Sequence, residues 1–488
     1  MEQMRMQNFI GGEWQDAESG AWYERENPAR TRDIIGRAPL SDARDVDRAV
    51  AAAKAAYPAW RAMSAPARGA ILHRAADCLA AKGPDLAVLM ARETGKPIVE
   101  AEAEAVRAAD ILRFFAAEAE RSFGEVYEGR DAQALLYTRR TPLGVVGIIS
   151  PWNFPLAIPA WKIAPSLVFG NTVVFKPSRE AAHTAGAFVA CLAEAGLPPG
   201  VLNLVVGGGE TIGQAIAAHP DVVAVSFTGS NAVGSTLAQT LTARGAKIQL
   251  ELGGKNPAVV LADADLDLAT ELIVLGAVQN AGQRCTATSR VIVERDVYEP
   301  LRERLLERFS EITVGDPLDR GTLVGPLVSA QRLKAVLGMM ARGEAEGAKR
   351  LYGGERLSGP GGEDGYFVRP ALFDAVSPES VLAQEEIFGP VLSIIPVRDF
   401  EEGIAVANGV RYGLSAAVFT NRLDRALAFA ERIDAGVVRI NGQTAGVEPH
   451  VPFGGMKASS SYSREQGRAA IEFFTQTKTV TIRPPSVS

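Results

Sequence analysis

The sequence predicts an α/β fold: a Rossmann-like doubly wound domain first, a second α/β domain after it, and a small β extension. Three observations predict it. Apolar strands alternate with helices between residues 143 and 252, which is typical of a parallel sheet covered by helices. A second alternating series begins near Asn256. The chain has 488 residues, enough for more than one unit of ~100–200 residues.

The stretch from Ala43 to Arg121 precedes this alternation and is predicted to be helical. Its apolar residues recur at helical spacing until Gly or Pro closes each segment. After it, Gln133 to Arg140 is predicted to be extended, and Leu143 to Ser150 is predicted to be a fully buried strand. The tail, EFFTQTKTVTIRP, alternates apolar and polar residues, which is typical of an edge strand that pairs elsewhere.

These elements set the expected boundaries. The first domain takes residues 1–124 and 142–252, and the second takes 253–471. The β extension takes residues 125–141 and 472–488.

Composition and charge exclude several classes of function. The net charge is −6 and the pI is near 5.6, so the sequence does not indicate the basic stripe that a nucleic-acid partner would require. No apolar run reaches the ~18 residues that span a membrane, and the first residues lack a secretory pattern. Three cysteines, an odd and sparse set, indicate a reducing compartment. A cytoplasmic protein is expected.

Cys285, in QNAGQRCTATSR, is the candidate nucleophile. A free cysteine is usually a small buried hydrophobe, and this is our interpretation of Cys78 and Cys191 on helix faces. Cys285 differs because Gly, Gln and Arg284 precede it. A cationic neighbour lowers a thiol pKa and favours the thiolate. The alternative, a structural cysteine, stays open on spacing alone.

Two polar residues follow apolar strands. Glu251, in QLELGGKNP, is costly to bury unless it is paired or functional, so it is either a general base or the partner of Lys255. Asn153, in PWNFP, lies at the carboxyl end of a buried strand, where α/β sheets place ligands. Its amide can donate to a developing oxyanion, although such a loop is more often only a packed turn.

Phosphate-binding signals are weak when each is taken alone. FTGSNAVG and GGGETIG match neither the Walker nor the G-x-G-x-x-G pattern, but they stand where helices begin after strands, and such helix ends attract phosphate. Lys176, in FKPS, can reach an adenosine ribose or is a solvated surface lysine. No clustered metal-ligand spacing occurs, so no metal is expected.

Seven segments together carry a resemblance that none carries alone. In chain order they are PWNFP, FKPS, FTGS with its later Gly234, LELGGKNP, the GQRC loop, QEEIFGPV, and PFGGMKASS followed by SREQG. The ordered set resembles the aldehyde dehydrogenase superfamily over almost the whole chain.

The resemblance implies a mechanism. Cys285 attacks the aldehyde, the oxyanion rests on Asn153 and the Cys285 N–H, and hydride passes to a nicotinamide. Glu251 then activates water to hydrolyse the thioester, and Glu465 assists proton relay. CoA-acylating relatives typically lack this glutamate, so a free acid is expected. The residues that the resemblance places at the cofactor are Ile149, Trp152, Lys176, Ser178, Arg179, Gly209, Gly229, Ser230, Val233, Gly234, Glu386 and Phe388.

One departure concerns the cofactor. NAD-preferring members often carry Glu three residues after the lysine, where it repels a 2′-phosphate. Here that position is Arg179, followed by Glu180. Because a guanidinium attracts a phosphate, NADP is favoured over NAD.

The substrate class is inferred from GQRCTATSRVIV, DAGVVRINGQTAGVE and PFGGMKASSSYSREQG, which are similar to 2,5-dioxopentanoate (2-oxoglutarate semialdehyde) dehydrogenases. Arg284 and Arg439 are candidates to hold the far carboxylate of a short acidic aldehyde. The alternative for each arginine is that it faces a structural carboxylate or solvent. Succinate semialdehyde dehydrogenases typically have an Arg after the PWNFP loop, where this chain has Trp161, so that alternative is weaker. Broad aldehyde specificity is a further alternative.

Two other classes of protein are alternatives to this enzyme. A cysteine hydrolase needs a histidine partner, and none of His73, His183, His219 and His450 lies in a motif that suggests one. A silent scaffold would be expected to lose the Cys or the Glu. The β extension is expected to join subunits, as in relatives, into a homodimer or homotetramer.

Overall fold

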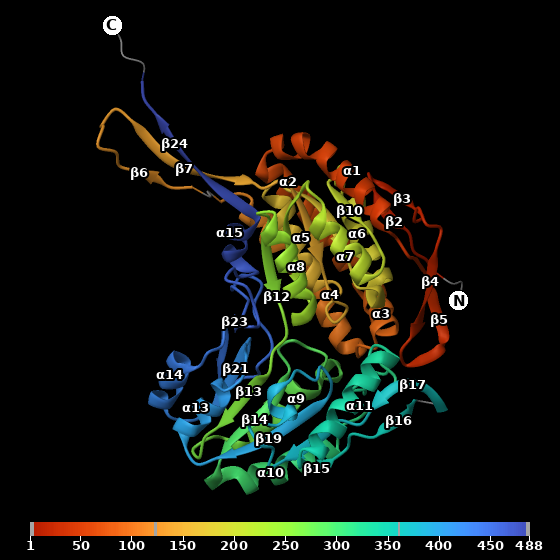
Figure 1. Ribbon diagram of the computed structural model, residues 1–488, viewed down its shortest axis with the longest axis vertical. Coiled ribbons are helices and arrows are strands. Elements are labelled where there is room, and N and C mark those ends of the chain that lie inside the picture. Colours follow the sequence, from red (N-terminus) through yellow and green to blue (C-terminus); the bar gives the residue numbers. More distant parts are fainter. Residues whose placement is uncertain (1–3, 122–123, 360–361, 485–488) are drawn as a thin grey trace.

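Two seven-stranded sheets, one above the other in Figure 1, form the centres of two domains. They are seen in a computed structural model that describes residues 4–121, 124–359 and 362–484. The strands of both sheets alternate with helices along the chain. The predicted class of fold is therefore confirmed.

The upper sheet has five parallel strands and an antiparallel hairpin at one edge. In sheet order the strands are β12 (Lys247–Glu251), β11 (Val222–Thr228), β8 (Val145–Ile149), β9 (Thr172–Lys176), β10 (Leu202–Leu204), β2 (Asn8–Ile10) and β3 (Glu13–Gln15). Alternate residues of β8 enter different cores: Val146 and Ile148 pack on one face, and Val145 and Ile149 on the other. Burial on both faces makes the strand a continuous apolar run, which is why it could be recognised.

Helices cover both faces of this sheet. One core includes α1 (Ala43–Ala62), α7 (Gly209–Ala218) and α8 (Asn231–Ala243). The other includes α2 (Ala65–Ala81), α3 (Gly83–Thr94), α4 (Ile98–Glu118), α5 (Ala157–Val168) and α6 (Ala182–Glu194). The helical prediction for residues 43–121 therefore holds up to the end of α4. Between α6 and β9, the short η1 (Arg179–Ala181) follows the strand end.

The lower sheet is parallel except for β15 at one edge. In sheet order its strands are β15 (Lys349–Tyr352), β18 (Ala371–Asp374), β19 (Val391–Val397), β14 (Thr288–Glu294), β13 (Asn256–Val260), β21 (Ser415–Phe419) and β22 (Val437–Ile440). Its helices are α9 (Leu266–Val278), η2 (Gln279–Gly282), α10 (Arg295–Ser310), α11 (Ala330–Ala345), α12 (Val381–Gln384), α13 (Phe400–Asn408) and α14 (Leu423–Arg432).

The tail of the chain returns to the upper domain. Ala470, Ile471, Phe473 and Phe474, in and beside α15 (Ala470–Phe474), enter one of its cores. The apolar side chains that precede the tail strand, at the end of the expected second domain and just after it, therefore pack in the upper core. β24 (Thr475–Ile482) then pairs along β7 (Leu135–Pro142), which pairs with β6 (Val126–Tyr127), in a sheet that projects at the upper left of Figure 1.

Short strands with charged residues were not predicted. They form the sheet of β1 (Met4–Arg5), β5 (Arg30–Pro39) and β4 (Trp22–Asn27), the pair of β16 (Arg356–Gly359) and β17 (Gly362–Val368), and the pair of β20 (Tyr412–Gly413) and β23 (Met456–Lys457). The last short helix is η3 (Gly467–Ala469).

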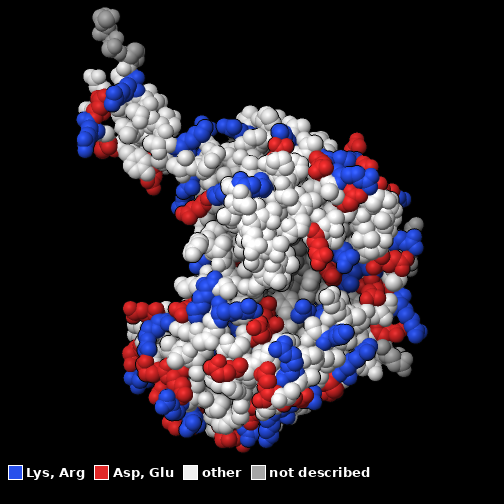
Figure 2. All heavy atoms as spheres, viewed as in Figure 1, with Lys and Arg blue, Asp and Glu red and all other residues white. Residues whose placement is uncertain are grey.

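Charges of both signs are mixed over the face shown in Figure 2, and the surface is hollowed between the two domains. Within the described part of the chain, no helix is both long and apolar enough to cross a membrane. The same residues contain no group of three or more His, Cys, Asp or Glu side chains suited to hold a metal ion.

Candidate active site

Cys285 lies where two cavities meet. One, of about 500 Å³, is also lined by Phe154, Trp161 and Arg284. The other, of about 390 Å³, is also lined by Asn153. Just before the cysteine, Asn280 and Ala281 adopt left-handed backbone angles, with φ of 51° and 53°. This sharp reversal at the end of η2 brings the Cys285 loop to the boundary between the domains.

The environment of Cys285 differs from the expectation. Burial raises the pKa of its thiol to about 12, and the carboxylates of Glu386 and Glu251 add to the rise. Arg284 does not offset this, because its guanidinium is engaged elsewhere: Nη2 pairs with Glu100, and Nη1 donates to Gln279 Oε1 at 2.7 Å. The expectation that the preceding arginine lowers the thiol pKa is therefore not met.

Glu251 ends β12 and is buried, at 2% exposure. Ser460 Oγ donates to its Oε2 at 2.7 Å, while its Oε1 has no hydrogen-bond partner. Burial raises the pKa of this carboxyl well above its ordinary value, and the nearby Glu465 carboxylate raises it further. The alternative partner, Lys255, makes no hydrogen bond through Nζ. Glu251 is therefore a buried carboxyl with one free oxygen, as a general base requires.

Glu465 stands behind Glu251 in a polar network that the sequence did not reveal in full. Trp161 Nε1 donates to its Oε2 at 2.7 Å, and its Oε1 pairs with the buried Lys162 Nζ. Ser226 Oγ also donates to Oε1, at 3.2 Å. Lys162 was missed, although a lysine inside the apolar helix WKIAPSLV is a signal for a buried ion pair.

Asn153 is buried beside the cysteine loop. Its Nδ2 donates to Gln283 O at 3.0 Å, and its Oδ1 has no partner. An amide nitrogen carries two hydrogens, so one donor remains for a ligand.

Helix α4 holds the loops that carry Asn153 and Cys285, and this role was also missed. Glu104 Oε1 accepts from the N–H groups of Leu156 and Ala157, at 2.9 and 3.1 Å, just after the PWNFP segment. One turn earlier, Glu100 Oε1 accepts from Asn280 N at 2.9 Å, at the reversal before the cysteine. The spacing of these two glutamates places both on one face of α4.

The second cavity is lined by several of the residues that are expected to contact the nicotinamide. Trp152, Gly229, Ser230, Glu386 and Phe388 all line it. The rings of Trp152 and Phe388 meet edge to face, with 5.6 Å between centroids. The first turn of α8, capped by the Ser230 hydroxyl, opens beside it.

Glu386 is a partly buried carboxylate held close to the backbone. Gly254 N donates to its Oε1 at 3.1 Å, and a Cβ at Gly253 would lie 2.3 Å from its Oε2, so a glycine is required there. Burial raises its pKa to about 7, while the Gly254 N–H and the cations of Arg332, Lys255 and Arg411 oppose the rise.

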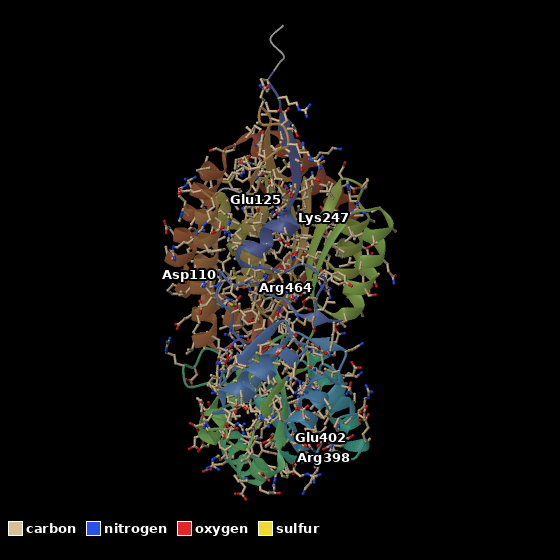
Figure 3. The ribbon with its side chains drawn as sticks, turned by 90° about the vertical axis from the view of Figure 1, so that its left-hand side faces the viewer. Asp110, Glu125, Lys247, Arg398, Glu402 and Arg464 are labelled. Carbon is tan, nitrogen blue, oxygen red and sulfur yellow. The ribbon has the colours of Figure 1, made fainter. Side chains whose placement is uncertain are left out.

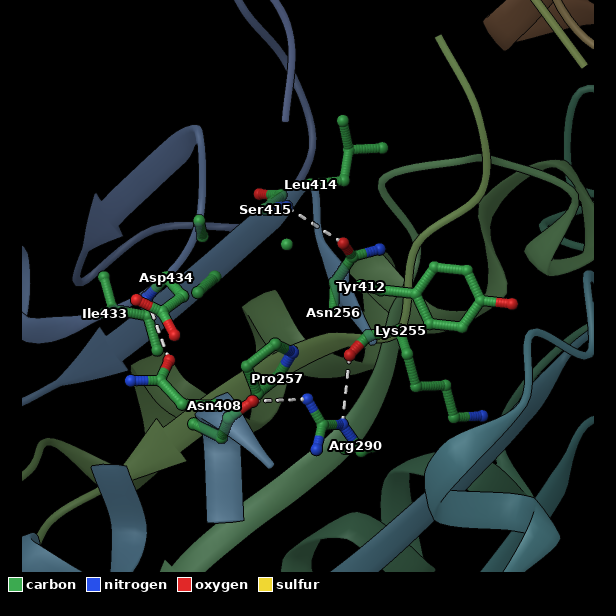
Figure 4. A pocket seen from close by; sticks show the side chains of 14 residues that line it. Lys255, Asn256, Pro257, Arg290, Asn408, Tyr412, Leu414, Ser415, Ile433 and Asp434 are labelled. Atoms are coloured by element: carbon green, nitrogen blue, oxygen red, sulfur yellow. Dashed lines mark hydrogen bonds between the residues drawn. The ribbon is translucent and has the colours of Figure 1, made fainter. Parts of the chain in front are cut away.

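Lys255 is a buried cation close to this carboxylate. Figure 4 shows its side chain extending away from Arg290, whose Nε donates to Lys255 O at 3.0 Å. Burial lowers the pKa of Lys255 to about 7, and the nearby guanidinium of Arg290 lowers it further.

The remaining cofactor candidates lie outside the lining of this cavity. Lys176, at the carboxyl end of β9, is buried, and its Nζ donates to Pro177 O at 2.9 Å. Burial lowers its pKa to about 8. The others lie on neighbouring elements of the same domain: Ile149 ends β8, Gly209 begins α7, Val233 and Gly234 are in the first turns of α8, and Ser178 and Arg179 follow β9.

The substrate candidates are distributed unevenly. Trp161 and Arg284 line the larger cavity together with Cys285, whereas Arg439 is not among the residues that line it. None of the four histidines belongs to the described lining of either cavity. His183 instead pairs with the buried Glu93, at 2.9 Å. A Cys–His hydrolase therefore has no partner for its nucleophile here.

Residues 14–480 match the Aldehyde dehydrogenase family. The chain belongs to this family. It is 51% identical over 483 residues to "Alpha-ketoglutaric semialdehyde dehydrogenase" from Bacillus subtilis, covering 99% of both chains. It is 42% identical to "Alpha-ketoglutarate semialdehyde dehydrogenase" from Haloferax volcanii, covering 97% of this chain and 98% of the relative. A solved NAD-dependent aldehyde dehydrogenase from Sinorhizobium meliloti matches with a TM-score of 0.96 and 37% identity, covering 100% of this chain and 97% of that one.

This aldehyde dehydrogenase is therefore an oxidoreductase that uses a nicotinamide dinucleotide. The residues present fit such a group. The free carboxylate of Glu386 can accept from ribose hydroxyls, and the first N–H groups of α8 suit a phosphate. The Trp152 and Phe388 rings provide apolar surface on which a nicotinamide can pack.

Proposed function

We propose that the enzyme oxidises a short acidic semialdehyde, 2,5-dioxopentanoate, to free 2-oxoglutarate. The observation that carries the proposal is the presence of guanidinium groups, Arg284 and Arg107, in the cavity beside Cys285. Guanidinium is the side-chain group best suited to a carboxylate. The full-length likeness to two semialdehyde dehydrogenases named for this compound supports the same substrate.

In the proposed reaction, the Cys285 thiol releases its proton to solvent, and the resulting thiolate adds to the aldehyde carbon. The oxyanion accepts hydrogen bonds from the free N–H of Asn153 Nδ2 and from the Cys285 backbone N–H, which stabilises the adduct. A nicotinamide cofactor would supply the hydride acceptor; Glu386 would hold its ribose, and Phe388 would pack beside its ring. Loss of hydride leaves a thioester on Cys285.

Glu251 then takes a proton from the water that attacks the thioester, so that the product is an acid and the thiol is restored. Burial and the Glu465 carboxylate raise the pKa of Glu251, which makes this carboxylate a stronger base than an exposed one. Glu465 lies behind it, bonded to Lys162, Trp161 and Ser226, and is our candidate to pass the proton onward.

An aldehyde panel with both cofactors on the purified protein tests the substrate. We expect kcat/KM for 2,5-dioxopentanoate to exceed that for succinate semialdehyde and for neutral aldehydes of similar length. Far better turnover of long-chain or aromatic aldehydes would contradict an acidic substrate.

The preferred cofactor is proposed to be NADP. Arg179 is exposed at the carboxyl end of β9, with its guanidinium 5.7 Å from the centre of the Tyr23 ring, and so its charge is available to a 2′-phosphate. Glu180, the acidic residue nearby, is occupied by a hydrogen bond from Ser178.

The projecting sheet is proposed to join subunits into a homo-oligomer in the cytoplasm. Val126, Tyr127, Leu135 and Ile482 are large apolar side chains exposed on this sheet. Exposed apolar side chains on an edge of this kind favour pairing with another chain.

A further inference from the structure

Arg107 stands one turn beyond Glu104 on the same face of α4 and lines the Cys285 cavity. Its Nη2 donates to Val447 O and, at 3.4 Å, to Gln466 Oε1. These are neutral acceptors, and Nε and Nη1 make no hydrogen bond within the described chain. Arg107 therefore offers N–H groups to whatever enters the cavity.

The other charges of this cavity are already paired. Arg284 is bound to Glu100, and Glu104 is bound to Lys96. Asp110, at the rim and visible in Figure 3, accepts from Arg113 at 3.2 Å. Among the described lining residues this leaves Arg107 and the exposed Glu448, between which no ion pair forms within 4.0 Å. Arg107 thus has the guanidinium in this cavity that forms no ion pair with a carboxylate of the described residues.

Arg107 is also near the nucleophile. Cys285 packs against the apolar cluster of Leu414, Val437, Val447 and Phe453. Arg107 holds the carbonyl of Val447, one member of that cluster. The thiol and the guanidinium therefore border the same cavity and the same apolar cluster, so one small ligand in this cavity can lie between them.

We propose that Arg107, rather than Arg284 or Arg439, binds the far carboxylate of the substrate. Arg284 would have to leave Glu100, and Arg439 does not line the cavity. Arg284 instead acts as a positioning residue for the cysteine loop. This inference rests on the proposed acidic substrate and names the residue that recognises it.

The test compares aldehydes of one length. For wild type, Arg107→Met and Arg107→Lys, kcat/KM is measured with 2,5-dioxopentanoate, 5-oxopentanoate and pentanal. We expect the ratio of either acidic aldehyde to pentanal to fall about 10- to 100-fold in Arg107→Met, mainly through KM, because a charged hydrogen bond is lost. Arg107→Lys keeps the charge and should lose less.

Arg284→Met is the matched control on the same cavity. It should lower kcat for acidic and neutral aldehydes alike, because it loosens the loop of the nucleophile, and so leave the ratio near that of wild type. A second measurement needs no turnover: 2-oxoglutarate should bind Cys285→Ala at least about 10-fold more tightly than Cys285→Ala/Arg107→Met, by calorimetry on folded protein.

The outcomes separate the two proposals. If wild type prefers acidic aldehydes and Arg107→Met keeps that preference and the 2-oxoglutarate affinity, the assignment to Arg107 is overturned while the substrate class stands. A change of ratio in Arg284→Met alone would transfer the role to Arg284. If wild type shows no preference over pentanal, the proposed substrate itself fails.

Discussion

Glu386 and Cys285 line the same cavity, and the carboxylate of the first raises the pKa of the thiol of the second. The two residues are far apart in the sequence, and the fold brings them to one cavity. Burial and the carboxylates of Glu386 and Glu251 therefore favour the protonated thiol of Cys285 over its thiolate.

Glu386→Gln should make the thiol more reactive in the absence of ligands. Removing a negative charge stabilises the thiolate, so the pKa of Cys285 should fall from about 12. At pH 8.5 Glu386 is ionised in wild type, since its pKa is about 7. The alkylation rate of Cys285 with iodoacetamide should then rise about 3- to 10-fold, since each pKa unit is a factor of ten in thiolate. Mass spectrometry assigns the label, and an unchanged or lower rate would contradict this electrostatic coupling.

Cys285→Ala should abolish aldehyde-dependent formation of reduced cofactor, with a loss of at least about 10³-fold. The absorbance of the reduced nicotinamide follows the reaction. Cys78→Ser is the matched control, since Cys78 lies partly exposed on α2, outside both cavities, and activity should stay within twofold of wild type. If Cys285→Ala kept an activity comparable to that of wild type, Cys285 would not be the nucleophile.

Glu251→Gln should stall the enzyme after the first turnover. Acylation needs no general base on water, so one equivalent of reduced cofactor should appear in a burst, followed by a steady rate lowered about 10²- to 10⁴-fold. Because the pKa of Glu251 is raised by burial and by Glu465, wild-type hydrolysis should rise with pH through that pKa and then level off. Stopped-flow traces across the pH range measure both. If the variant shows no burst, Glu251 acts before the loss of hydride rather than after it.

Arg179→Glu should shift the cofactor preference towards NAD. A carboxylate at this position repels a 2′-phosphate, and the guanidinium that attracts it is lost. We expect the ratio of kcat/KM for NADP to that for NAD to fall about 10-fold or more, since one charge-assisted contact is worth that much. The comparison is made at equal cofactor concentrations. A strong preference of wild type for NAD would overturn the proposed role of Arg179 before any variant is made.

Glu104→Gln should destabilise the fold. The substitution leaves Lys96, which is 1% exposed, as an unpaired buried cation, and loss of one partner of a buried pair costs about 3–5 kcal/mol. Chemical denaturation with Trp fluorescence measures this. The control is Glu102→Gln on the same helix, whose pair with Arg320 is exposed and contributes no more than about 1 kcal/mol. Equal effects of the two substitutions would show that the buried pair is not the cause.

The sequence predicted those secondary-structure elements whose residue pattern is local and repetitive. Val145–Ile149 could be recognised as a strand because both of its faces are buried, and Thr475–Ile482 because it alternates. The charge state of Cys285 could not be predicted, because the partner of Arg284 is Glu100, 184 residues earlier in the chain. Lys162 likewise finds Glu465 303 residues away. Such pairs are set by the packing of two domains, which no local pattern encodes.

The face of α4 that carries Glu100, Glu104 and Arg107 has a consequence for how such an enzyme can change. One residue inserted between them would rotate everything beyond it by about 100° around the helix axis and detach a loop from its support. Exchange of the side chain at position 107 disturbs neither glutamate. The substrate can therefore be changed by substitutions in one turn of α4. The length of α4 before that turn cannot change, because Glu100 and Glu104 must stay in place to hold the loops of Cys285 and Asn153.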